Sequence, residues 1–131
     1  MKDLFKYQGP ALTWALFILI ICSVPFGEVG KSTLFFPGFD KVTHCGLFFV
    51  LAVLISRGLL RKGGRGLFSF ATAAGALFTT LIYGGLIEVL QRYFFTWRSG
   101  EWDDLFCDTV GACMGVFAIL LTLNAANDAK G

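Results

Sequence analysis

The stretch LFSFATAAGALFTTLIYGGLIEVL, residues 67–90, decides the fold of this chain. It is predominantly apolar, and Glu88, near its end, is its only charged side chain. A helix of about 20 such residues crosses the hydrocarbon core of a bilayer. We therefore predict a membrane-spanning helix here, with a carboxylate close to one membrane face.

Three further apolar runs have the composition of membrane spans, at about residues 11–26, 42–60 and 105–124. Of the 131 residues, 56% are hydrophobic and 15% are charged. An average soluble domain has about 25% charged residues. The sequence therefore predicts an all-α membrane protein, a bundle of four transmembrane helices that forms a single domain over residues 1–131.

The first run has an alternative interpretation as a secretory signal peptide. It is the shortest of the four, and Lys2 and Lys6 precede it as a basic region would. No small-x-small cleavage motif follows it, however, and Trp14 and Pro25 suit a retained helix. We expect this span to be retained.

The connecting segments predict the orientation. Residues 57–66 carry several basic side chains and no acidic one, whereas residues 27–41 balance lysines against acids. Because basic loops stay in the cytoplasm, we expect both termini to be cytoplasmic and residues 27–41 and 92–104 to lie outside. The basic side chains are those of Arg57, Arg61, Lys62 and Arg65.

The charge distribution argues against a nucleic-acid partner. The formal net charge is only +2, and membrane orientation and anionic lipid already explain the basic segment. We therefore expect a membrane-embedded protein with a membrane component as its partner.

A dense polar cluster follows the third predicted span. Glu88, Gln91 and Arg92 are three and four residues apart, so we expect them to share one helical face. Ionisable groups beside hydrocarbon are costly, so a functional site is the default interpretation of such a cluster. The cluster continues with Arg98, Glu101, Asp103, Asp104 and Asp108.

A second polar group lies at the predicted start of the second span. Asp40 and His44, the only histidine, are four residues apart and can project from one helical face beside Lys41. Taken alone, Asp40 fits a helix N-cap and His44 fits a buried hydrogen-bonding residue. The predicted topology places both at the membrane level of Glu88 and Asp108. We therefore predict one polar site on the extracytoplasmic side.

In order and spacing, these polar residues resemble those of the VanZ-like membrane proteins of bacteria, a family linked to low-level teicoplanin resistance. The resemblance implies a multi-pass protein of the bacterial cytoplasmic (inner) membrane with a role in the cell envelope. Many members carry asparagine at the position of Asp108, so this chain adds an acid there. The resemblance covers about residues 10–124 and rests on Asp40, Lys41, His44, Phe48, Glu88, Gln91, Arg98, Ser99, Glu101, Asp104, Asp108, Gly111 and Gly115.

Three classes of function fit this site. The protein binds or acts on a lipid or a lipid-linked envelope precursor, or it is an intramembrane enzyme, or the cluster is an internal ion-pair network of a structural or partner-binding protein. In the enzyme, His44 acts as general acid or base and is oriented by Asp40 or Glu88. Whether a reaction is catalysed stays open. The residues expected to bind the ligand are Lys41, Gln91, Arg98, Asp104 and Asp108.

A metal site is an alternative for the same cluster. The set offers mainly carboxylate oxygens, which suit a hard or borderline divalent cation. With one histidine and no helical ligand motif, we expect no metal and no other cofactor. The candidate ligands are Asp40, His44, Glu88, Asp104 and Asp108.

Glycines predict how the helices pack beneath the site. Gly111 and Gly115 continue the stripe of Asp104 and Asp108 along the fourth span. This spacing lets a neighbouring helix approach closely. Gly84, one turn before Glu88, is expected to admit another backbone near that carboxylate.

Overall fold

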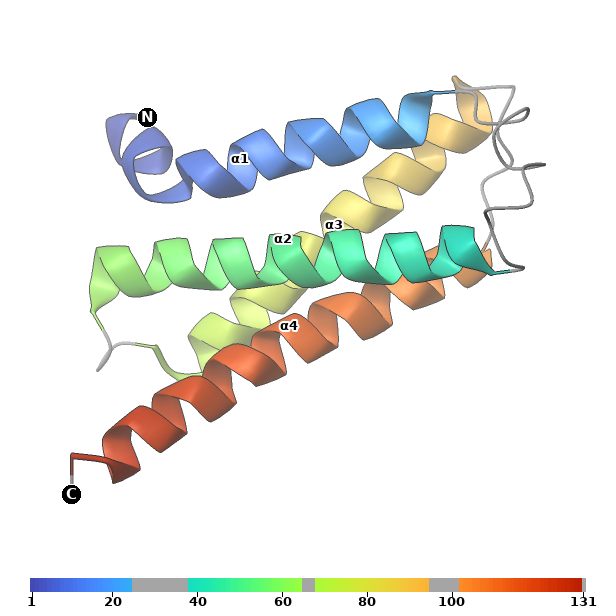
Figure 1. Ribbon diagram of the computed structural model, residues 1–131. Coiled ribbons are helices and arrows are strands. Elements are labelled where there is room, and N and C mark those ends of the chain that lie inside the picture. Colours follow the sequence, from blue (N-terminus) through green and yellow to red (C-terminus); the bar gives the residue numbers. More distant parts are fainter. Residues whose placement is uncertain (25–37, 65–67, 95–101, 131) are drawn as a thin grey trace.

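The protein is a bundle of four helices (Figure 1). The computed structural model describes residues 1–24, 38–64, 68–94 and 102–130. All four helices are long and apolar enough to cross a membrane, which confirms the predicted fold class. The helices are α1 (Lys2–Ser23), α2 (Phe39–Gly63), α3 (Phe70–Tyr93) and α4 (Trp102–Asp128).

Successive helices run in opposite directions, so both termini lie at one end of the bundle (Figure 1). The opposite end holds the last turns of α1 and α3 and the first turns of α2 and α4. We call it the polar end, because the candidate site residues of the described chain lie there. Among the described helices, α2 packs most extensively against α4 and also contacts α1 and α3.

The helix ends differ from the predicted spans in ways that local chemistry explains. The first helix begins at Lys2, earlier than predicted, and stops at Ser23, before residue 26. Val24 is extended, with φ −74° and ψ 132°, as expected for the residue before a proline. The third helix begins at Phe70 rather than residue 67, because the Ser69 side chain caps it by accepting a hydrogen bond from the Thr72 amide.

The contact between α2 and α4 is close because α4 presents glycines to it. A Cβ atom on Gly115 would lie 2.6 Å from the carbonyl oxygen of Phe49, and one on Gly111 would overlap that of Cys45. Side chains at these two positions would therefore force the helices apart. The packing role predicted for the glycine pair is confirmed.

Helix α1 is attached through apolar packing and through polar side chains that reach backbone carbonyls. Trp14 Nε1 donates to the Leu47 carbonyl of α2 at 3.0 Å. The Tyr83 hydroxyl of α3 donates to the Ala15 carbonyl of α1. Ala11, Ile18 and Cys22 of α1 are buried in the apolar core, so packing and these hydrogen bonds together fix its position.

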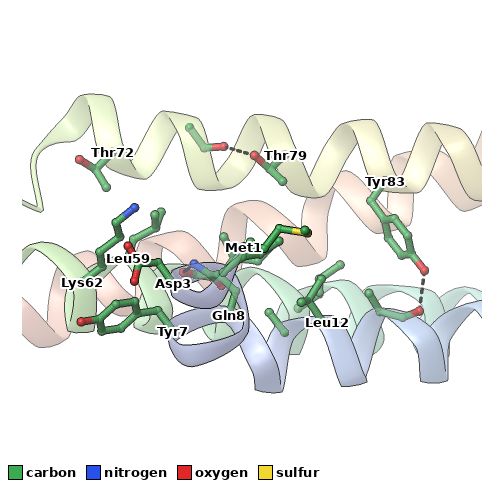
Figure 2. A pocket seen from close by; sticks show the side chains of 16 residues that line it. Met1, Asp3, Tyr7, Gln8, Leu12, Leu59, Lys62, Thr72, Thr79 and Tyr83 are labelled. Carbon is green, nitrogen blue, oxygen red and sulfur yellow. Dashed lines mark hydrogen bonds between the residues drawn. The ribbon is translucent and has the colours of Figure 1, made fainter.

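A large cavity of about 870 Å³ lies between α1, α2 and α3 in the half of the bundle that holds the termini. Figure 2 shows Leu12, Leu59 and Tyr83 in its wall, with Lys62 and Asp3 among the few charged members. Its lining is mostly apolar. None of the described acidic side chains of the polar end lines it, so the cavity is separate from that cluster.

Candidate functional site

The polar end brings residues of three helices together. His44 follows the first turn of α2, Glu88 lies near the end of α3, and Asp108 lies in the second turn of α4. The interpretation of Asp40 as the N-cap of α2 is wrong, because Gly38 holds that position with a φ of 87°. Asp40 lies within the first turn, where its carboxylate can project from the helix beside His44.

His44 and Asp108 form the central contact. Nδ1 of His44 lies 3.0 Å from Oδ1 of Asp108, and the two residues are 2% and 0% exposed. The sequence suggested Asp40 or Glu88 as the group that orients the imidazole, whereas Asp108 is the residue that meets Nδ1. The reason is the glycine stripe of α4. Asp108 lies three residues before Gly111, on the face that packs against α2.

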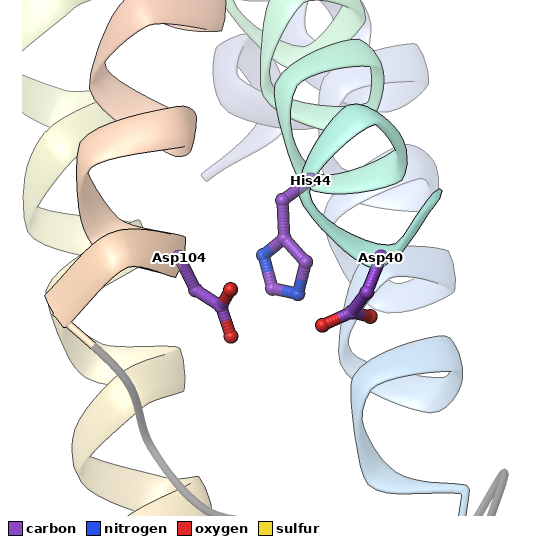
Figure 3. Close-up of side chains that lie close together, drawn as sticks. All are labelled: Asp40, His44 and Asp104. Atoms are coloured by element: carbon purple, nitrogen blue, oxygen red, sulfur yellow. The ribbon is translucent and has the colours of Figure 1, made fainter. Parts of the chain in front are cut away.

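Two sets of acidic groups surround the imidazole. The outer set joins it to Asp40 and Asp104, and the inner set joins it to Glu88 and Asp108; within each set the ligand-type atoms lie within 4.8 Å of one another. Figure 3 shows the His44 ring between the Asp40 and Asp104 carboxylates of the outer set. His44 therefore links a set that includes the exposed Asp40 to a set deeper in the bundle.

Lys41 neutralises part of the outer set. Its Nζ lies 3.5 Å from Oδ1 of Asp104 and 3.8 Å from Oδ2 of Asp103. The Asp104 side chain is 3% exposed and that of Lys41 is 39% exposed, so the pair is shielded from water on the Asp104 side only, whereas the Asp103 side chain is 79% exposed. Lys41 and Asp104, both expected to bind a ligand, thus contact each other in this structure.

Glu88 connects the inner set to a groove between α3 and α4. The groove has a volume of about 330 Å³. Glu88 and Arg92 share its wall, as expected for residues four apart on one helix. Among the described residues, its lining consists of Gly85, Glu88, Val89, Arg92, Tyr93, Trp102 and Leu105.

The expectation that Glu88, Gln91 and Arg92 share one helical face is wrong for Gln91, which faces α1 instead of the groove. Gln91 is fully buried, and its Nε2 donates to the Cys22 carbonyl of α1 at 3.2 Å. Consecutive residues on an α-helix are rotated by roughly 100°, so Gln91 and Arg92 cannot share one direction. In this structure Gln91 joins α3 to α1, and its predicted role in ligand binding stays a prediction.

Gly84 makes room for the Asp108 carboxylate. A Cβ atom there would lie 3.2 Å from Oδ2 of Asp108 and 3.2 Å from Cε1 of Phe48. Within the described part of the chain, buried Oδ2 of Asp108 has no hydrogen-bond partner. The expectation that Gly84 admits another backbone near Glu88 is wrong, because its neighbours here are the side chains of Asp108 and Phe48.

Part of the predicted site lies outside the described residues. Arg98, Ser99 and Glu101 fall between α3 and α4, in the segment 95–101. The ligand-binding role expected of Arg98 stays a prediction.

The family comparison agrees with the resemblance found in the motifs. The sequence model of the VanZ/LLP1 family matches residues 2–123. The chain belongs to the VanZ/LLP1 family. No curated protein and no solved structure matches it.

The VanZ/LLP1 match includes all of α1, α2 and α3 and most of α4, so every described site residue lies within it. Sequence reasoning missed two features of this family member's site. It did not pair His44 with Asp108, although the stripe shared by Asp108 and Gly111 was a signal for that pairing. It also did not assign Arg92 to a groove, because a groove depends on how far α4 lies from α3.

Proposed function

We propose that this VanZ/LLP1 protein binds, at its polar end, the headgroup of a lipid or of a lipid-linked cell-envelope precursor. The observation that carries this proposal is the double position of Glu88. Its side chain lines the groove between α3 and α4 and also belongs to the buried set with His44 and Asp108. A headgroup in the groove would therefore meet the buried acidic set through Glu88.

The chemistry of the groove suits an amphipathic ligand with an anionic group. The Arg92 guanidinium can form paired hydrogen bonds with a phosphate. Tyr93 and Trp102 are 70% and 79% exposed and offer ring faces at the depth of a headgroup. Val89 and Leu105 supply an apolar wall for the first part of a chain. Carboxylates of the inner set can accept hydrogen bonds from sugar hydroxyls or amines.

The orientation proposed from the basic segment at the end of α2 places the polar end on the outer side of the cytoplasmic membrane. Arg61 and Lys62 lie in the last turn of α2, at the opposite end of the bundle from His44. Lipid-linked precursors of the bacterial envelope are used on the outer side, where glycopeptide antibiotics also act. A role in resistance to such antibiotics is therefore part of the proposal.

Replacing Arg92 by glutamine tests this function. A hydrogen bond to a charged group contributes about 1.5–3 kcal/mol, so R92Q should weaken headgroup binding by about ten- to a hundredfold. Native mass spectrometry of the detergent-solubilised protein would measure dissociation constants for phosphatidylglycerol and for an undecaprenyl-linked precursor.

Arg57 provides the matched control, because it is also exposed but lies on α2 in the half of the bundle that holds the termini. R57Q should bind both lipids like the parent protein. An equal loss in R57Q and R92Q, or no binding by the parent protein, would refute the groove as the lipid site.

The buried His44–Asp108 contact favours a second candidate, an intramembrane enzyme. A carboxylate on one ring nitrogen fixes the tautomer and leaves the other nitrogen able to take or give a proton. Nε2 would then act on the ligand. Mass spectrometry after incubation with lipid-linked precursors separates the two candidates, because an enzyme yields converted species and a binder yields only the bound, unchanged lipid.

A further inference from the structure

We propose that the inner set of His44, Glu88 and Asp108 holds one divalent metal ion of the Mn²⁺ or Zn²⁺ class. The inference goes beyond lipid binding and does not depend on it. It also departs from the sequence-based expectation of no metal, which rested on the single histidine. The structure brings that histidine together with carboxylates of two other helices.

The spacing of His44 and Asp108 fits two neighbouring ligands of one metal ion. With metal–ligand bonds of about 2.1 Å, neighbouring ligands of an octahedral or tetrahedral ion lie ~3.0–3.4 Å apart. The Nδ1 atom of His44 and Oδ1 of Asp108 are 3.0 Å apart. The Glu88 carboxylate lies within 4.8 Å of both residues, close enough for its side chain to turn toward a shared ion. An ion here would replace the direct His44–Asp108 hydrogen bond by two bonds to the metal.

Asp108 offers a further donor atom. Its side chain is fully buried, and Oδ2 has no hydrogen-bond partner within the described residues. Gly84 keeps a side chain away from this oxygen, since a Cβ atom there would lie only 3.2 Å from it. A buried carboxylate oxygen without a hydrogen bond is costly, and a metal ion would satisfy it.

Charge favours the inner set over the outer one. The Glu88 and Asp108 carboxylates carry two negative charges, which a divalent ion balances when His44 is neutral. In the outer set, the Lys41 ammonium already lies 3.5 Å from Asp104, and Asp40 is exposed. Mixed imidazole and carboxylate ligands suit Mn²⁺ and Zn²⁺, because Mn²⁺ prefers oxygen donors and Zn²⁺ accepts both types.

Pulsed electron paramagnetic resonance with Mn²⁺ tests the site directly. The chain has one histidine, so an imidazole-nitrogen coupling to Mn²⁺, in a preparation without a histidine tag, identifies His44 as a ligand. We expect one Mn²⁺ per chain with this coupling, displaced by Zn²⁺. Stoichiometric Mn²⁺ without the nitrogen coupling, or no Mn²⁺ bound, would overturn the proposal. The test uses the parent protein alone, so it does not depend on whether a variant folds.

Variants then locate the carboxylate ligands. Removing a group that is hydrogen-bonded to a metal ligand typically lowers metal affinity by about 10–100-fold. Removing a ligand itself, by D108N or E88Q, should lower the Mn²⁺ affinity at least as much. D103N is the matched control, since the Asp103 side chain is 79% exposed on the same helix. An equal loss in D103N would indicate surface binding and reject the site.

R92Q should retain Mn²⁺ affinity even where lipid binding is lost, which separates failure of this inference from failure of the proposed function.

Discussion

Replacing Gly111 by alanine is expected to destabilise the protein more than any other single-methyl change at the polar end. The added Cβ atom would overlap the Cys45 carbonyl oxygen. A backbone carbonyl cannot rotate away as a side chain can, so α2 and α4 must separate. Overpacking of this kind costs about 1–3 kcal/mol, and occasionally more. The free energy of unfolding in mixed micelles of a mild detergent and sodium dodecyl sulfate measures the effect.

Gly46 provides the control for Gly111. It lies on α2 next to Cys45, and a Cβ atom there would meet nothing within 4 Å. Alanine is also a better helix former than glycine by about 1 kcal/mol, so G46A should leave the stability unchanged or raise it. If G46A and G111A cost the same, the close approach of α2 and α4 is not what Gly111 provides.

Removing His44 and Asp108 together is expected to cost less than the sum of the two single removals. Either single change to alanine leaves the other buried polar group without its partner, a cost of about 1–3 kcal/mol. In the double variant that penalty disappears, so the coupling energy should be about 0.5–3 kcal/mol, as for other contacting residues. Unfolding is measured with a chelator present, so that no metal ion contributes.

Lys41 and Asp103 provide the comparison pair. Their charged atoms are 3.8 Å apart, but the Asp103 side chain is 79% exposed. Exposed pairs contribute about 0–1 kcal/mol, so their coupling should be smaller than that of His44 and Asp108. Additive effects of the His44 and Asp108 substitutions would mean that the two groups do not interact in the folded protein.

Single alanine variants of the site residues separate a structural network from a functional site. If every alanine variant of Asp40, His44, Glu88 and Asp104 unfolds, the cluster is a structural network. Variants that insert and fold but lose lipid binding support the site. Asp40 is the most informative of these positions, because it is exposed and its removal leaves no cavity in the core.

The sequence was sufficient to predict the four helices, because a bilayer requires long apolar segments and each of the four runs supplies one. It was less informative about helix ends. Helix α1 extends back to Lys2, since charged residues beyond the hydrocarbon core can continue a helix. Its other end is set by the extended backbone of Val24, the residue before a proline. A hydropathy profile carries no information about that preference.

The pairing inside the site was harder to predict, because it depends on the rotation of each helix about its axis. Asp104 and Asp108 were correctly placed on the stripe of Gly111, but that alone does not say which carboxylate meets His44. The answer follows from the height at which α2 contacts α4, set by the Cys45 carbonyl against Gly111. Glu88 and Gln91 illustrate the same limit, since one side chain lines the groove and the other contacts α1.

The most direct test of lipid recognition at the polar end is photo-crosslinking in intact bacterial membranes. The photoreactive residue p-benzoylphenylalanine would replace Trp102, which lines the groove, or Phe94, which is 69% exposed at the same end but does not line it. Mass spectrometry would identify the lipids attached at each position. Recognition in the groove predicts one lipid or lipid-linked precursor strongly enriched at residue 102 over residue 94, and lost in R92Q. The same mixture of bulk lipids at both positions would contradict it.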